Sequence, residues 1–203
     1  MTTDYKALDL GRYMKIDRIL HTPQEDIDKQ VQIVAVLADM TEDEVLHLPL
    51  TDYAAMAAQT AFLGKQCEPA EMDGKPITLQ GMRLVPVTDY RRINTAQYVD
   101  FQTLAKDFPA TIPELLSCFL LPEGKDYNEG YDIAEVHKAV LSLMLPEALG
   151  LTAFFLLSFS KSITDSLTSL GRMKRNRRTI AKAKAMRMQM EALLASLGDG
   201  LQM

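Results

Sequence analysis

The sequence contains no tryptophan and only two cysteines, and these scarcities narrow the kinds of protein it can encode. Cys67 and Cys118 lie far apart, one in a polar turn and one in an apolar run, so neither a disulfide framework nor a zinc site is expected. We expect two free thiols in a reducing cytosol. The missing tryptophan and the 12 methionines favour adaptable helical packing surfaces over a rigid aromatic binding cleft.

Long apolar runs are also missing. The longest, from Leu151 to Phe159, is broken by Thr152 and Ser158 and has roughly half the length that a bilayer crossing requires. Residues 1–6 lack the basic and then apolar layout of a secretory signal. We therefore expect a soluble protein without a membrane partner, and 203 residues suffice for a substantial core without crosslinks.

The sequence has little that resembles a catalytic or cofactor-binding motif. His21, His47 and His137 are scattered, and no serine or cysteine neighbours them in a nucleophile motif. Residues 63–65 lack the first glycine and the hydroxyl of a phosphate-binding loop, and residues 126–132 lack the ligand alternation of a calcium loop. We predict no enzyme, no cofactor and no metal. An enzyme whose site is assembled in space is the least favoured alternative, and it requires a histidine beside a carboxylate or thiol in a cleft.

What the chain does contain is an abrupt change of charge after Gly171. Residues 172–203 hold eight of the 22 basic residues and only two of the 27 acidic ones, so this segment carries +6 and residues 1–171 carry −11. This division is typical of an acidic folded body with a cationic appendage that meets a partner. The predicted partner-binding residues are the eight cations of this segment: Arg172, Lys174, Arg175, Arg177, Arg178, Lys182, Lys184 and Arg187.

Three interpretations of the basic segment are open. Docking on an acidic protein surface, including the acidic body of a second copy, is favoured because it matches the charge division. Nucleic-acid binding is an alternative, since eight cations can neutralise several phosphates, but the segment lacks aromatic residues for stacking and the acidic body would repel the same polyanion. The third interpretation is a solvated helix over about 173–197, because the composition is rich in helix formers.

Helical patterns occupy most of residues 1–66, the predicted N-terminal unit. Residues 7–20 could form a strand pair or a short helix, and periodicity does not decide between them. Cap, acid and apolar spacing then predicts three helices with very short connections, over about 23–40, 41–48 and 51–63. The stretch 67–76 is rich in turn residues and forms a boundary.

The second predicted unit, residues 77–171, combines one β-hairpin with helices. The hairpin spans about 77–87 around Gln80-Gly81, and Pro86 predicts that its second strand lies at a sheet edge. Four helices are expected to follow, the last over 147–170. The predicted fold is therefore mainly α, a compact helical domain with one small hairpin and a basic C-terminal helix over 172–203.

The order of these segments resembles that of a phage protein family. The stretches that carry the resemblance are Thr41–Tyr53, the hairpin Ile77–Val87, Asp89–Phe101, a predicted helix over Ile112–Leu121, the loop Pro122–Asp132 and the apolar helix with Phe154-Phe155. They resemble tail assembly chaperone-like proteins, especially those of phages and prophages of gut Bacteroidota. The resemblance covers about residues 15–172, and its motifs are packing and turn motifs without a chemical signature.

This resemblance implies a small non-enzymatic phage morphogenesis protein of the host cytoplasm. Such proteins bind the aggregation-prone tape measure protein, and tail tube subunits, until the tail polymerises, and they have no catalytic residues to carry over. The basic segment 172–203 departs from the family pattern. It leaves room for an alternative, a virion structural protein retained near the head–tail junction or with packaged DNA, which contacts DNA or an acidic partner through that segment.

Overall fold

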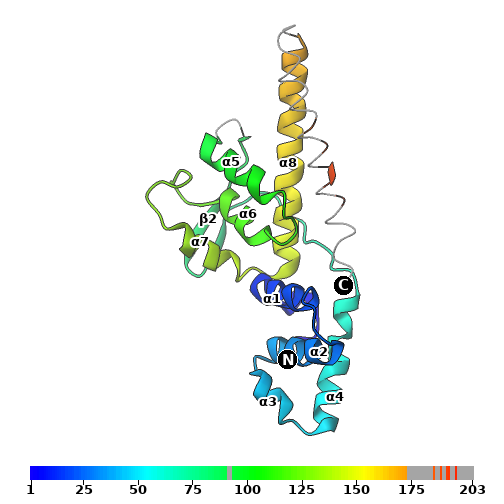
Figure 1. Cartoon of the computed structure of the whole chain (residues 1–203). Coiled ribbons are helices and arrows are strands. Elements are labelled where there is room, and N and C mark those ends of the chain that lie inside the picture. The colour runs from blue at the N-terminus through cyan, green and yellow to red at the C-terminus, as the bar shows by residue number, and fades with distance from the viewer. Residues whose placement is uncertain (91–92, 173–184, 186–187, 189–190, 193–194, 196–203) are drawn as a thin grey trace.

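The fold was analysed in a computed structural model, which describes residues 1–90 and 93–172 and the isolated tail positions 185, 188, 191–192 and 195. Residues 163–172 are described by their backbone. The chain is mainly helical with one small antiparallel sheet of three strands, which confirms the predicted fold class (Figure 1). The predicted tail helix over 173–197 lies for the most part outside the described residues, and the isolated tail positions are helical.

The first residues form a 3₁₀ turn, η1 (Tyr5–Ala7), and then a helix, α1 (Leu10–Leu20), which settles the open prediction for 7–20. Asp9 begins α1 because its side chain accepts a hydrogen bond from the Arg12 amide at 2.8 Å. The Leu10 amide donates to the Leu143 carbonyl at 2.7 Å, and the Leu145 amide donates to the Leu8 carbonyl at 2.8 Å. These bonds tie the N-terminal segment to the start of the last helix.

Three helices follow as predicted: α2 (Asp26–Ala38), α3 (Glu42–Leu46) and α4 (Leu50–Ala58). The last turns of the predicted third helix are a 3₁₀ segment, η2 (Gln59–Gly64), rather than α-helix. A small cluster of buried residues on α2 and α3, centred on Val34 and Val45, holds these helices together. Helix α2 packs on α1 and also on α3 and α4, and so joins these helices.

The predicted hairpin is confirmed by β1 (Ile77–Leu79) and β2 (Met82–Pro86), joined at Gln80-Gly81 with φ values of 49° and 81°. A third strand, β3 (Leu120–Pro122), pairs with the other side of β2. The prediction that Pro86 marks an edge strand was therefore wrong. Pro86 is the last residue of β2, so its missing N–H costs little, and the ladder continues through the Val87 amide, which donates to the Phe119 carbonyl at 2.9 Å.

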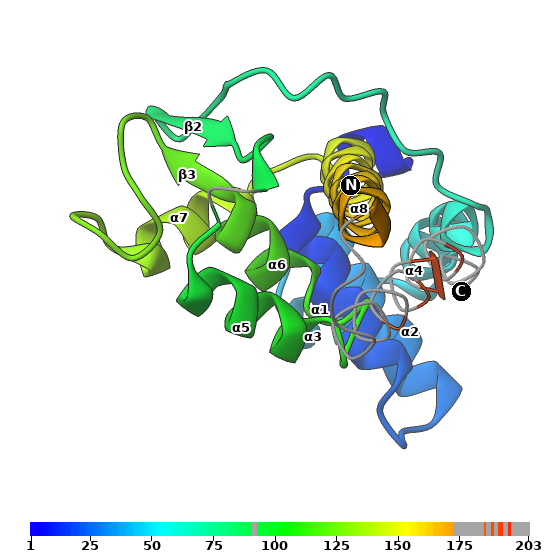
Figure 2. The same cartoon turned by 90° about the horizontal axis from the view of Figure 1, so that it is seen from above.

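The main core forms where α5 (Thr95–Leu104), α6 (Ile112–Phe119) and α7 (Ile133–Val140) pack against the last helix, α8 (Leu145–Arg172). Its centre is a group of aromatic rings in mutual contact, and the centroids of Phe101 and Phe159 are 4.9 Å apart. All but one of the eight residues of α6 are buried, and the exposed one is Glu114. Figure 2, which looks along α8, shows α5, α6 and the sheet gathered on one side of this helix.

The loop 65–76 crosses α8 at close range. The Ala70 amide donates to the Pro146 carbonyl at 2.8 Å, and a Cβ atom added to Gly150 would collide with the Ala70 backbone. Cys67, which the sequence placed in a polar turn, has only 3% of its surface exposed and lies in the main core. The loop is thus part of the packed structure, since its backbone is hydrogen-bonded to α8 and the Cys67 side chain is buried in the main core.

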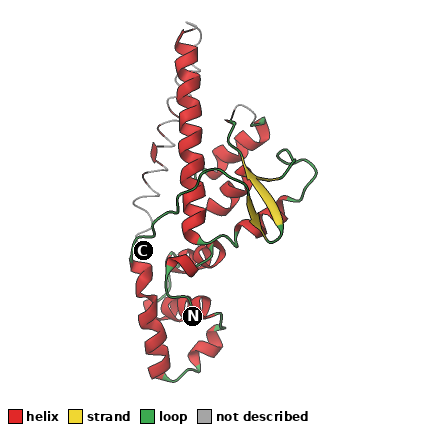
Figure 3. Ribbon diagram, turned by 180° about the vertical axis from the view of Figure 1, so that it is seen from behind, coloured by secondary structure: helices red, strands yellow, loops and turns green. Residues whose placement is uncertain are grey.

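The two ends of the molecule differ in character. Helices α2, α3 and α4 form one end, and α8 projects from the other end beyond α5 and α6 (Figures 1 and 3). None of the described helices is both long and apolar enough to cross a membrane.

Candidate functional site

The residues predicted to bind a partner begin at the end of the projecting helix. Arg172 is the last residue of α8, while Lys174, Arg175, Arg177, Arg178, Lys182, Lys184 and Arg187 lie outside the described residues. The buried side chains of α8 extend to Phe159, among the positions whose side chains are described. From there the helix continues for a rise of about 20 Å to Arg172, the first residue of the basic segment.

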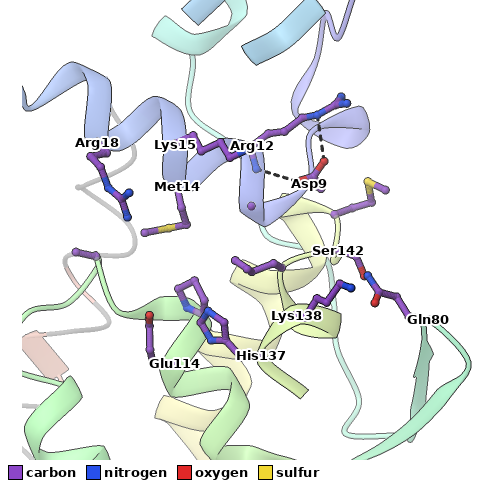
Figure 4. Close-up of a pocket in the computed structure, with 15 residues that line it drawn as sticks. Asp9, Arg12, Met14, Lys15, Arg18, Gln80, Glu114, His137, Lys138 and Ser142 are labelled. Atoms are coloured by element: carbon purple, nitrogen blue, oxygen red, sulfur yellow. Dashed lines mark hydrogen bonds and ion pairs between the residues drawn. The ribbon is translucent and has the colours of Figure 1, made fainter. Parts of the chain in front are cut away.

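A groove that the sequence analysis did not predict lies between α1, α6 and α7 (Figure 4). It has a volume of about 720 Å³. Met14 and Lys15 come from α1, Glu114 from α6, and His137 and Lys138 from α7. The apolar surface of the groove includes Met14, which Figure 4 shows on the side of α1 that faces Glu114 and His137.

The groove carries more positive than negative charge, on a body that is acidic as a whole. Arg12 is compensated, since its guanidinium lies 3.5 Å from the Asp9 carboxylate and 3.6 Å from that of Asp39. In contrast, Lys15, Arg18 and Lys138 form no ion pair with any residue that the structure describes, and all three are exposed. One signal could have revealed this groove in the sequence: the spacing of Arg12, Lys15 and Arg18 places three cations along one side of a helix.

A second cluster joins three side chains in the core below the loop 123–131. The Tyr127 hydroxyl donates to Asp100 Oδ2 at 2.8 Å, and Cys118 Sγ lies 3.4 Å from the same hydroxyl. Burial raises the pKa of Cys118 to about 11, so the thiol is protonated at neutral pH and is a weak nucleophile. Desolvation also raises the pKa of Tyr127.

This cluster accounts for the position of the loop 126–132, whose acidic residues superficially resemble those of a calcium-binding loop. Tyr127 is buried and anchors the loop through its hydroxyl, and its backbone carbonyl accepts a hydrogen bond from Asn94 Nδ2 at 3.4 Å. Asp132, at the end of the loop, caps α7 by accepting from the Ala134 amide at 2.9 Å. Within the described part of the chain, no three or more histidine, cysteine, aspartate or glutamate side chains are grouped as metal ligands would be.

The three histidines have separate surroundings. His21 and His47 place their Nδ1 atoms 2.8 Å and 2.6 Å from the carbonyls of Asp17 and Asp43, where they close the last turns of α1 and α3. His137 lines a pocket of about 410 Å³ together with Cys118 and Tyr127. A histidine beside a thiol in a pocket is the arrangement that the enzymatic alternative requires. Among the described residues, however, no hydrogen bond joins His137 to the Cys118 thiol. Acyl transfer by a cysteine depends on a hydrogen bond between the base and the nucleophile.

Comparison with known proteins adds no relative. No protein-family model, no curated protein and no solved structure matches this chain. The function is therefore inferred from the charge, surface and shape of the molecule together with the resemblance described above.

Proposed function

We propose that this chain is a non-enzymatic assembly factor of a phage tail, which acts like a tail assembly chaperone and binds tape measure or tail tube protein. The basic segment 172–203 is the proposed contact. The observation that supports this proposal best is the course of α8: among its positions with described side chains the last buried one is Phe159, and its helical backbone continues to Arg172. A rigid helix of this kind holds the start of the basic segment at a distance from the body.

The distance has an electrostatic consequence. Residues 1–171 carry −11 and residues 172–203 carry +6, so a basic segment close to the body would be neutralised by it. Interactions between exposed charges are largely screened beyond about 8 Å at physiological ionic strength, and the projecting part of α8 is about 20 Å long. The start of the segment at Arg172 therefore lies beyond this distance from the main core, where it can attract an acidic partner that the body itself would repel.

The test is an affinity pull-down with mass spectrometry from cells that express the surrounding operon. The full-length chain is compared with a variant in which Arg175, Arg177, Arg178 and Lys182 are replaced by glutamine. A matched control replaces Lys6, Lys65, Lys106 and Lys161, four exposed lysines of the body that form no ion pair with described residues, and so changes the net charge equally.

We expect the full-length chain and the control to recover a long tape measure-like protein or a tail tube protein, and the tail variant to recover at least tenfold less. Recovery should fall with increasing salt and persist after nuclease treatment. Equal recovery by the tail variant would contradict the proposed contact.

The basic segment also supports a second candidate, a virion protein that contacts DNA near the head–tail junction. Eight cations between 172 and 187 can neutralise several phosphates, and binding would then fall steeply with salt. The same pull-down distinguishes this function, since recovery of nucleic acid alone, lost on nuclease treatment, would favour it over the chaperone.

A further inference from the structure

The connection between α3 and α4 forms an exposed apolar corner. Leu46 ends α3 with 66% of its surface exposed, and Leu50 begins α4 with 80% exposed. Single exposed leucines are common, but two on one short corner, residues 42–52, form a patch that another surface can bury. The corner lies at the end of the molecule opposite the projecting part of α8 (Figure 1).

The same corner is strongly acidic. Residues 23–58 contain eight acidic residues and a single basic one, Lys29, which gives this stretch a charge of −7. All eight acidic residues are exposed, including Asp43 and Asp52 on the corner itself. Lys29 does not oppose them there, because its Nζ donates to the Leu20 carbonyl at the end of α1, at 3.0 Å.

The groove between α1, α6 and α7 has the complementary chemistry and shape. It is concave where the corner is convex, and Lys15, Arg18 and Lys138 form no ion pair with other described residues. Met14 and Leu141 provide apolar surface between these cations. Asp9 and Glu114 also line the groove, but the Asp9 carboxylate is already engaged by Arg12.

We infer that the α3–α4 corner of one copy of this chain docks into the groove of a second copy. Leu46 and Leu50 then cover Met14 and Leu141, while Asp43 and Asp52 approach the unpaired cations. The contact forms between copies because α2 packs on α1, α3 and α4 and so fixes the corner in place, and none of the residues that line the groove belongs to the corner. This inference goes beyond the proposed function, since it does not involve residues 172–203.

The two docking surfaces are different, so the contact is head-to-tail. Each copy that binds through its corner leaves its own groove available to another copy, and such contacts build rings or open filaments rather than closed twofold dimers. A corner of 11 residues is smaller than the roughly 20 to 30 residues that each side of a stable interface contributes. We therefore expect dissociation constants of roughly tens to hundreds of micromolar, which correspond to a contact that forms at high local concentration.

The experiment is analytical ultracentrifugation of the purified full-length chain, over concentrations of roughly 10 to 500 μM chosen to bracket this affinity. Two variants are compared with the natural sequence, a groove variant with Lys15→Glu and Arg18→Glu and a corner variant with Asp43→Lys and Asp52→Lys. We expect the natural chain to form larger species as its concentration rises, and each variant alone to weaken this association at least tenfold. A mixture of the two should associate again, because the intact corner of one variant meets the intact groove of the other, and the reversed corner and the reversed groove also carry opposite charges.

Matched controls carry the same charge changes at exposed positions outside both surfaces. Lys106→Glu with Lys161→Glu matches the groove variant, and Glu129→Lys with Glu135→Lys matches the corner variant. Both controls should associate like the natural chain. If the corner variant melts at a lower temperature, Leu50→Gln provides a second test, since a side chain that is 80% exposed contributes little to folding.

Three results would overturn the inference: a natural chain that stays monomeric throughout, a variant that associates like the natural chain, or a mixture that remains monomeric. The glutamine variant of residues 175–182 separates this inference from the proposed function. It should lose the phage partner but keep self-association within about twofold, whereas loss of self-association would show that the basic segment, and not the groove, binds the corner.

Discussion

At the scale of single residues, buried polar groups have structural roles that the sequence alone did not reveal. Tyr127 connects Asp100 and Cys118, which belong to α5 and α6, and so fixes the loop 123–131 to the core. Cys118 was expected to be a small core residue, and its burial confirms this. The hydrogen bonds were not predictable because 27 residues separate Tyr127 from Asp100, and nothing local marks the pair.

Replacing Tyr127 by phenylalanine tests this role. The change removes the donor to Asp100 and leaves a carboxylate without its partner, so we expect the free energy of unfolding to fall by about 1 to 3 kcal/mol. The melting temperature should decrease by roughly 2 to 4 °C for each kcal/mol. Tyr98→Phe is the control, because the Tyr98 hydroxyl forms no hydrogen bond with described residues, and an equal effect of both changes would refute the role of Tyr127.

The buried thiols predict a pH dependence. Burial raises the pKa of Cys118 from 9.0 to about 11, so the folded state retains a proton that the unfolded state loses. This contribution to stability is complete below pH 9 and is lost as the pH rises toward 11. In urea titrations, Cys118→Ala should make the decline of stability over this range shallower, by up to about 1.4 kcal/mol per pH unit. An unchanged slope would show that this thiol titrates as it does in the unfolded chain.

At the scale of elements, the sequence predicted correctly those helix starts and turns that are set by neighbouring residues. The predicted helix start at Thr41 is confirmed by a capping box, in which the Glu44 carboxylate accepts from the Thr41 amide at 2.7 Å and the Thr41 hydroxyl accepts from the Glu44 amide at 3.2 Å. The hairpin was predictable for the same reason, since Gln80-Gly81 adopts positive φ values. These patterns need only a few neighbouring residues.

Elements that depend on distant pairing were missed. Strand β3 follows directly after α6 and looks like the end of that helix in the sequence, and it becomes a strand only by pairing with β2. The groove was missed for a related reason. Lys15 and Lys138 are far apart in the sequence, and both lie within residues 1–171, whose net charge is −11. The candidate site of the basic segment was predicted from composition, and its first residue, Arg172, lies at the end of α8.

The contact between loop 65–76 and α8 gives a prediction at this scale. Gly150→Ala places a methyl group against the Ala70 backbone, which must move, so we expect a loss of about 1 to 3 kcal/mol of stability. Gly64→Ala is the matched control, because nothing lies within 4 Å of the added Cβ there. Chemical denaturation should show a lower midpoint for Gly150→Ala and almost no change in the midpoint for Gly64→Ala. Equal midpoints for the two variants would argue against the close approach.

At the scale of the whole molecule, charge and shape are arranged along one direction. An acidic end formed by α2, α3 and α4 lies opposite the projecting part of α8, which leads into the basic segment (Figure 1). The core between these ends contains the aromatic cluster and the sheet. This arrangement separates the surface proposed to bind a phage partner from the surfaces proposed to bind another copy.

The most direct test of the proposed function is the solubility of the partner. Tape measure or tail tube protein from the same operon is co-expressed with the natural chain, with the glutamine variant of Arg175, Arg177, Arg178 and Lys182, or with the matched body control, and its soluble fraction is measured. The account predicts a soluble partner with the natural chain and the control, and a several-fold loss to the pellet with the tail variant. A partner that is equally soluble with the tail variant, or without any form of the chain, would contradict it.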